Sequence, residues 1–82
     1  MDIDYSNKKV VFSAHARERI KQRGLSEEWV IDIIRNHHIN LPVQKDRTQE
    51  LRKKRENTYY YVVIKHQEED FLVITAGEAD YE

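Results

Sequence analysis

The sequence contains no cysteine and only two glycines among its 82 residues. The absence of cysteine excludes disulfides, thiolate catalysis and cysteine-ligated zinc, and it fits a reducing compartment such as the cytosol. With only Gly24 and Gly77, the chain has no glycine-rich phosphate loop, which argues against nucleotide-dependent phosphoryl transfer. No apolar run approaches the roughly 18 residues of a membrane span, and residues 1–5 lack the basic and apolar parts of a signal peptide. We therefore expect a cytoplasmic protein without membrane association.

The chain is small and highly charged, with 39% hydrophobic and 35% charged residues. This composition predicts a single domain over residues 1–82, because aromatic and clustered β-branched residues can still form a core. Domains of this size seldom gain more than roughly 3–5 kcal/mol from their core. We therefore expect a monomer or homodimer, and a small core of this kind is also consistent with binding to a protein partner.

Basic and acidic residues are unevenly distributed along the chain. All 14 Lys and Arg residues lie between Lys8 and Lys65, where only 7 acidic residues accompany them and leave a charge of +7. The acidic residues near the two ends bring the net charge of the whole chain to -1. Because the local field governs an encounter, the basic segment could present a phosphate-binding face. The alternative is a solvated surface of mixed charge.

A first helix is predicted to begin near Ala14, after a short apolar strand at residues 10–12. The side-chain oxygen of Ser13 can accept hydrogen bonds from the free amides of the first turn. Ala16 and Ile20 would share the buried face because they lie four residues apart. A neighbouring polar stripe would consist of His15, Arg19, Gln22 and Arg23. Gly24 can then adopt the left-handed conformation that often ends a helix.

A second, amphipathic helix is predicted to follow Ser26. Ser26 is a suitable cap, and the acidic residues 27 and 28 would lie at the positive end of the helix dipole. Apolar positions then recur at helical spacing, with a histidine at the end of the series. The series is Trp29, Val30, Ile33, Ile34 and His37. Residues 36–40 are predicted to end this helix.

After Pro42 the pattern changes from helix to strand. Residues 43–45 are a weak strand candidate, and residues 48–54 are an ambiguous polar one. Residues 59–64 and 71–75 are stronger candidates, because nearly every position is aromatic, β-branched or otherwise apolar. The polar residues 66–70 are few enough for an antiparallel hairpin. A short strand, two helices and then antiparallel strands indicate an α+β domain with the helical pair on one face of the sheet.

The segment from Phe12 to Ser26 carries the most specific pattern in the chain. It resembles the opening signature of a small prokaryotic family called domain of unknown function 4258, Ser-x-His-Ala-x-x-Arg-x-x-x-Arg-Gly-(Ile/Leu)-Ser. Residues 71–75 are similar to the last strand of that family, whereas the charged, glycine-free residues 44–57 depart from its pattern. The family is grouped by fold with RelE/ParE-type toxins and related metal-independent ribonucleases. The resemblance therefore implies a RelE/ParE-like fold, RNA cleavage or binding, and an antitoxin-like protein partner.

A ribonuclease without a metal needs a general base for the 2′-hydroxyl, an acid for the leaving 5′-oxygen, and cations for the phosphorane charge. His15 is the candidate base or acid, because imidazoles exchange protons near neutral pH. Arg19 and Arg23 follow at one-turn intervals and could hold the phosphate, and Thr75 could bond a phosphate oxygen. In a purely structural interpretation, His15 bonds the backbone or a carboxylate such as Glu18, and the arginines pack across Tyr rings or hold the helix to the sheet.

Further candidates for contact with RNA are basic or aromatic. A surface tyrosine could stack on a base, and strand alternation puts at least one of the rings at positions 59–61 on each face; the alternative role is core filling. The basic run at positions 52–55 suits phosphate contact, and the alternative is a solvated loop. The predicted nucleic-acid contacts are Arg17, Arg52, Lys53, Lys54, Arg55 and Tyr60.

No metal ion or other cofactor is predicted. Adjacent residues on a helix diverge by about 100°, so His37 and His38 would point apart, and no carboxylate completes a zinc motif. The serines at positions 6, 13 and 26 are better explained as loop or cap residues than as nucleophiles. The alternative to an RNA-directed protein is a non-enzymatic interaction module that binds a protein partner through a sheet edge or groove.

Overall fold

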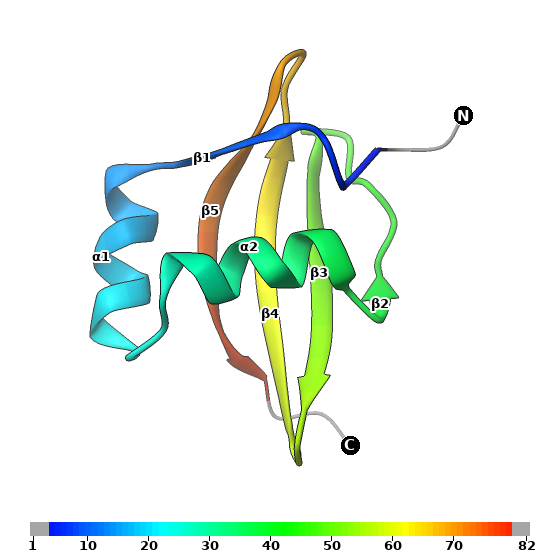
Figure 1. Cartoon of the computed structure of the whole chain (residues 1–82). Coiled ribbons are helices and arrows are strands. Elements are labelled where there is room, and N and C mark those ends of the chain that lie inside the picture. The colour runs from blue at the N-terminus through cyan, green and yellow to red at the C-terminus, as the bar shows by residue number, and fades with distance from the viewer. Residues whose placement is uncertain (1–3, 80–82) are drawn as a thin grey trace.

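A computed structural model describes residues 4–79, which form one strand, two helices and then four strands (Figure 1). The elements are β1 (Lys9–Phe12), α1 (Ala14–Gln22), α2 (Glu27–Asn36), β2 (Ile39–Asn40), β3 (Thr48–Arg55), β4 (Thr58–His66) and β5 (Asp70–Ala79). This order confirms the predicted α+β class. Among the described residues, no helix is long and apolar enough to cross a membrane.

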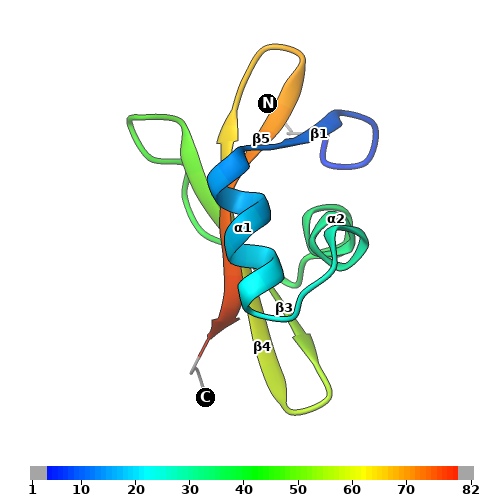
Figure 2. The same ribbon diagram turned by 90° about the vertical axis from the view of Figure 1, so that its left-hand side faces the viewer.

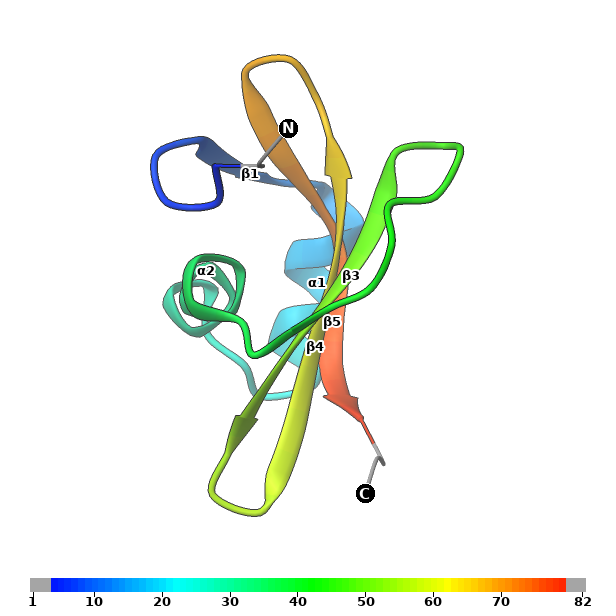
Figure 3. The ribbon, with the colours of Figure 1, turned by 90° about the vertical axis from the view of Figure 1, so that its right-hand side faces the viewer.

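The strands form one mixed sheet in the order β1-β5-β4-β3-β2. The first strand pairs parallel with β5, and the other neighbours pair antiparallel. Helix α2 crosses one face of the sheet, as Figures 1 and 3 show. Helix α1 packs along β5 beyond the point where β1 ends (Figure 2). The prediction of a helical pair on one face therefore describes α2 well, whereas α1 lies at the side of the sheet.

Local sequence signals determine where both helices begin and end. The Ser13 hydroxyl accepts a hydrogen bond from the Ala16 amide, and the Ser26 hydroxyl accepts one from the Trp29 amide, each at 3.0 Å. These bonds satisfy amides that a helix leaves free in its first turn. Gly24 has a φ of 70° directly after α1, where a side chain would be strained. Both predicted caps and the predicted end of the first helix are confirmed.

The core lies between α2 and the sheet and reaches the inner side of α1. Its buried apolar residues are Ala16, Ile20, Val30, Ile33, Ile34, Leu51, Val62, Ile64, Phe71, Val73 and Ala76. They include the predicted buried face of α1 and three members of the series predicted for α2, whose other members, Trp29 and His37, are half-buried. They also include alternate positions of the long strands, as expected for a sheet covered on one side. We call the other side of the sheet, which faces away from α2, the open face.

The strand candidates 48–54, 59–64 and 71–75 are confirmed, and each observed strand is longer. The candidate at residues 43–45 is wrong, because the short strand lies earlier, at Ile39–Asn40. Residues 44–48 instead form a turn in which the Gln44 amide donates to the Thr48 carbonyl at 2.8 Å. Arg47 has a φ of 70° within that turn. The apolar spacing around Val43 was too short to distinguish a strand from a connecting loop.

One register shift between β4 and β5 determines which side chains reach the open face. Val63 is opposite Thr75, but Ile64 is opposite Val73, so Ile74 is an extra residue in a β-bulge. Side chains alternate along a strand, and one extra residue reverses the alternation beyond it. Val73 before the bulge and Ala76 after it are therefore both buried, and Thr75 points to the open face.

Candidate functional site

Helix α1 carries an exposed line of polar side chains at one-turn intervals. His15, Arg19 and Arg23 lie four residues apart, beside the buried face made by Ala16 and Ile20. The Arg19 Nε–H donates to Nε2 of His15 at 3.3 Å. A neutral imidazole that accepts at Nε2 carries its proton on Nδ1. The structure thus brings together two of the residues predicted for catalysis at an exposed position, with Nε2 of His15 as the acceptor of the Arg19 bond.

The third member of this line reaches across to the sheet. Nη1 of Arg23 donates to the carbonyl oxygen of Ala76 at 2.5 Å, and it also lies 3.3 Å from both the Thr75 and Tyr61 hydroxyl oxygens. All three acceptors are uncharged. Within residues 4–79, no carboxylate lies within ion-pair distance of either Arg19 or Arg23. Their positive charges therefore remain available to an anion.

Gly77 makes room for this contact. It is opposite Tyr61 in the β4–β5 register. A Cβ at this position would lie 2.9 Å from Nη1 of Arg23 and 3.2 Å from the Tyr61 hydroxyl. Both distances are shorter than ordinary contacts of about 3.5 Å, so a side chain here would displace its neighbours. From the sequence we selected Tyr60 and not Tyr61 as the contact for RNA, and Gly77 was given no role. The signal that could have found Tyr61 is the alternation of residues 59–61 about the core.

We refer to the four predicted residues and the two added by the structure as the α1–β5 site: His15, Arg19, Arg23, Tyr61, Thr75 and Gly77. It combines an imidazole, two guanidinium groups and two hydroxyl groups at the border between α1 and the open face. Guanidinium groups and hydroxyls are the usual partners of phosphate oxygens. The arrangement is suited to binding a phosphate and to moving a proton beside it.

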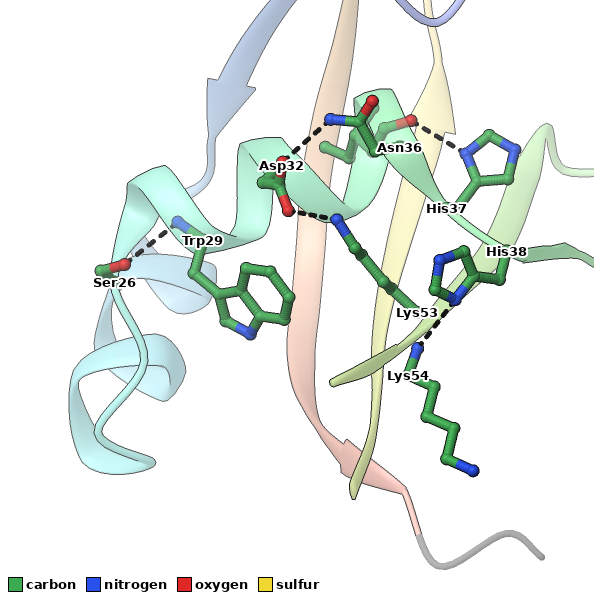
Figure 4. Close-up of polar contacts among 9 residues, drawn as sticks. Ser26, Trp29, Asp32, Asn36, His37, His38, Lys53 and Lys54 are labelled. Carbon is green, nitrogen blue, oxygen red and sulfur yellow. Dashed lines mark hydrogen bonds and ion pairs between the residues drawn. The ribbon is translucent and has the colours of Figure 1, made fainter. Parts of the chain in front are cut away.

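The predicted basic cluster is divided between the two sides of the sheet. Lys53 points to α2, where its Nζ pairs with a carboxylate oxygen of Asp32 at 2.6 Å (Figure 4). Lys53 and Arg55 also lie 5.3 and 5.0 Å from the ring centroid of Trp29. The hydrogen bond from Lys53 lowers the pKa of Asp32, which keeps the pair charged. Lys53 and Arg55 therefore lie away from the α1–β5 site.

The other half of the cluster lies on the open face. Arg52 is opposite Tyr61 and pairs with Glu50 at 2.5 Å. Lys54 is opposite Tyr59, and its Nζ lies 5.6 Å from the centroid of that ring. The alternative of a solvated loop is wrong, because the run belongs to β3, and alternation along the strand puts two basic residues on each side of the sheet.

Two further predicted RNA contacts also lie apart from the site. Tyr60 faces α2, where its ring meets Trp29 edge-on with centroids 5.4 Å apart. Arg17 is exposed on the opposite flank of α1 from His15 and lines a shallow depression with Lys21. The structure therefore assigns Tyr60 to packing, and it separates Arg17 from the polar line.

The remaining histidines contact the protein itself. Nδ1 of His37 bonds the Ile34 carbonyl at 2.9 Å, and Nδ1 of His38 accepts from the Lys54 amide at 3.3 Å (Figure 4). His66 bonds Gln49 Oε1 at 2.8 Å, and burial together with the nearby Lys8 lowers the pKa of His66. No three His, Asp or Glu side chains among residues 4–79 come close enough to hold a metal ion.

Neither curated proteins nor solved structures provided a match to this chain. One family model, Domain of unknown function (DUF4258), matches residues 12–78. The matched region begins at the last residue of β1 and reaches into the end of β5, so it contains every member of the α1–β5 site. Since the match covers most of the chain, from the strand before α1 to the strand that carries Thr75, the protein belongs to the DUF4258 family.

Proposed function

We propose that this protein is an RNA-binding, metal-independent endoribonuclease of the toxin type, and that the α1–β5 site cleaves the RNA. One observation carries the proposal. Arg19 donates to the imidazole of His15, and Arg23 lies beside the hydroxyl groups of two sheet residues. Neither arginine has a carboxylate partner among residues 4–79. Unneutralised guanidinium groups beside a proton acceptor are what phosphodiester transfer to an internal hydroxyl requires.

The reaction needs no group beyond those at the site and water. Arg19 exchanges its bond to His15 for a phosphate oxygen, which frees Nε2 of the imidazole. Nε2 takes the proton of the 2′-hydroxyl as O2′ attacks the phosphorus, while Arg23 and the Thr75 hydroxyl hold the equatorial oxygens. The bond from phosphorus to O5′ breaks, O5′ takes a proton from water, and the hydroxide that remains takes the proton from the His15 imidazolium, which restores the neutral imidazole. The products are a 2′,3′-cyclic phosphate and a 5′-hydroxyl.

The family and the order of elements support this proposal by analogy. A strand, two helices and a mostly antiparallel sheet fit the RelE/ParE-like fold that the sequence resemblance implies. On this analogy, the protein would be the toxin of a toxin–antitoxin pair and would act on cytoplasmic RNA. Because one fold hosts many functions, we assign the activity to the side chains of the α1–β5 site and not to the fold.

The decisive experiment is incubation of purified protein with a 5′-labelled RNA oligonucleotide in EDTA. We expect cleavage that leaves a 2′,3′-cyclic phosphate, and a loss of at least roughly 100-fold in rate for His15→Ala, within the usual range for a general base. The matched pair is Arg19→Ala and Arg17→Ala, which remove the same charge from opposite flanks of α1. Equal rates for these two variants, or a fully active His15→Ala protein, would show that the α1–β5 site does not cleave RNA.

A second candidate function is that of a non-enzymatic protein-interaction module. It is favoured by the sheet edge at β2, where Ile39 and Val43 are 38% and 42% exposed. An edge strand has unpaired backbone groups that can pair with a strand of a protein partner, and exposed apolar side chains beside it would add to that contact. A protein without RNA cleavage, in which an Ile39→Ser/Val43→Ser variant loses a partner that the wild type binds, would support this function instead.

A further inference from the structure

Two tyrosine rings lie two residues apart on the open face. Tyr60 contacts Trp29 of α2, so Tyr59 and Tyr61 must point to the other side of β4. Both rings are partly exposed. On the β5 side they are opposite Ala79 and Gly77, which are too small to cover them. The open face therefore presents two neighbouring rings that no large side chain of β5 covers.

Cationic groups lie beside both rings. Nζ of Lys54 is 5.6 Å from the Tyr59 centroid, and Nη1 of Arg23 is 3.3 Å from the Tyr61 hydroxyl. Glu50, the acidic residue of β3 on this face, is paired with Arg52. A chain of phosphates would meet Arg23 at one end of the tyrosine pair and Lys54 at the other. The charge thus fits a polyanion laid along the two rings.

We infer that the open face binds single-stranded nucleic acid, with one base stacked on Tyr61 and the next on Tyr59. Successive side chains on one face of a strand are separated by about 6.6 Å, which leaves one ring for each base of an extended strand. Bases in a duplex already stack on one another, whereas unpaired bases are free to stack on aromatic side chains of a sheet. The inference rests on the proposed function for the nature of the polymer and specifies that its substrate is unpaired.

The test separates binding from cleavage by using a 2′-O-methyl RNA hexanucleotide, which has no free 2′-hydroxyl to attack. Its affinity is measured by fluorescence anisotropy at low salt. We expect Tyr59→Leu and Tyr61→Leu to bind it roughly 5- to 150-fold more weakly, which corresponds to about 1–3 kcal/mol for a stacked base. Tyr61→Phe keeps the ring and should stay within about threefold of the wild type.

The matched control is Tyr60→Leu, because it removes the same side chain from the side that faces α2. This variant should bind the hexanucleotide as the wild type does, although loss of the Trp29 contact should lower its stability. Circular dichroism verifies that each variant is folded. Lys54→Ala should weaken binding and reduce its salt dependence, since one fewer phosphate would be neutralised.

The outcomes distinguish the inference from the proposed function. Cleavage of RNA by a wild type whose Tyr59→Leu and Tyr61→Leu variants bind normally would refute the tyrosine surface and leave the nuclease intact. Binding of the hexanucleotide that the Tyr59→Leu and Tyr61→Leu variants lose, in a protein that cleaves no RNA, would support the tyrosine surface and refute the nuclease. No binding of the hexanucleotide, or equal affinity for a duplex of the same length, would overturn the inference; a protein partner that is lost in the same two variants would also overturn it.

Discussion

Replacing Gly77 by alanine should displace Arg23 while leaving the fold intact. The added Cβ would lie 2.9 Å from Nη1 of Arg23 and 3.2 Å from Cε1 of Tyr61. Since contacts to carbon are most favourable near 3.5 Å, the guanidinium would have to retreat by roughly 0.6 Å. Its hydrogen bonds to Thr75 and Tyr61 are already 3.3 Å long, and a further extension would break them.

Two opposing effects set the change in the free energy of unfolding. Overpacking typically costs about 1–3 kcal/mol, but here the crowded atoms include the flexible end of an exposed arginine, which can move away cheaply. Alanine in a strand is also more favourable than glycine by roughly 0.5–1 kcal/mol. We expect Gly77→Ala to destabilise the protein by about 0–2 kcal/mol. The larger effect should be on RNA cleavage, which should fall at least about tenfold as Arg23 leaves the phosphate position.

Urea unfolding measures the change in stability, and the ¹⁵N–¹H resonance of the Arg23 Nε reports the displacement of the guanidinium. Neither measurement requires the protein to cleave RNA. Gly24→Ala is the control, since its Cβ meets nothing within 4 Å but its φ of 70° should cost about 1–2 kcal/mol. We expect this variant to lose stability while the Arg23 resonance stays in place. A folded Gly77→Ala protein with an unshifted Arg23 resonance would refute the proposed contact between α1 and β5.

Three further predictions concern stability and use urea titration. Ile33→Ala should destabilise the protein by roughly 2–5 kcal/mol, because Ile33 is fully buried, and a loss below about 1 kcal/mol would show that α2 does not cover the core. Burial lowers the pKa of His66 below 6.5, so the unfolded chain binds a proton more readily; stability should fall as the pH decreases from 7.5 to 5.5, and His66→Gln should reduce that fall. Asp32→Asn removes a partly exposed ion pair with Lys53 and should cost less than about 1 kcal/mol at neutral pH; a larger loss would mean that this pair anchors α2 to the sheet.

The helices were predictable because their signals are local. Ser13 and Ser26 cap the helices that follow them, and the apolar spacing at Ala16 and Ile20 defines the buried face within a single turn. These interactions connect residues three or four positions apart, so they can be read directly from the sequence. The same spacing placed His15 and Arg19 side by side before any tertiary contact was known.

The sheet contact at Thr75 could not be predicted. Thr75 has the same parity as the buried Phe71 and Val73, so regular alternation would have turned its hydroxyl toward the core. The bulge at Ile74 reverses that parity and brings the hydroxyl to Arg23, 52 positions earlier in the chain. Whether a strand contains a bulge depends on its partner strand, so an apolar run such as residues 71–75 gives no sign of it.

One acidic segment of the chain, the turn between β4 and β5, lies far from the tyrosine pair. Residues 67–69, which include two glutamates, connect the end of β4 to the start of β5. Lys54 and Tyr59 lie at the other end of β4, and Figure 1 shows these two ends of the sheet far apart. Screening in physiological salt limits charge interactions to about 8 Å, so this acidic turn does little to cancel the field of the basic residues around the tyrosine pair. Substitutions in the acidic turn should therefore change RNA affinity far less than Lys54→Ala.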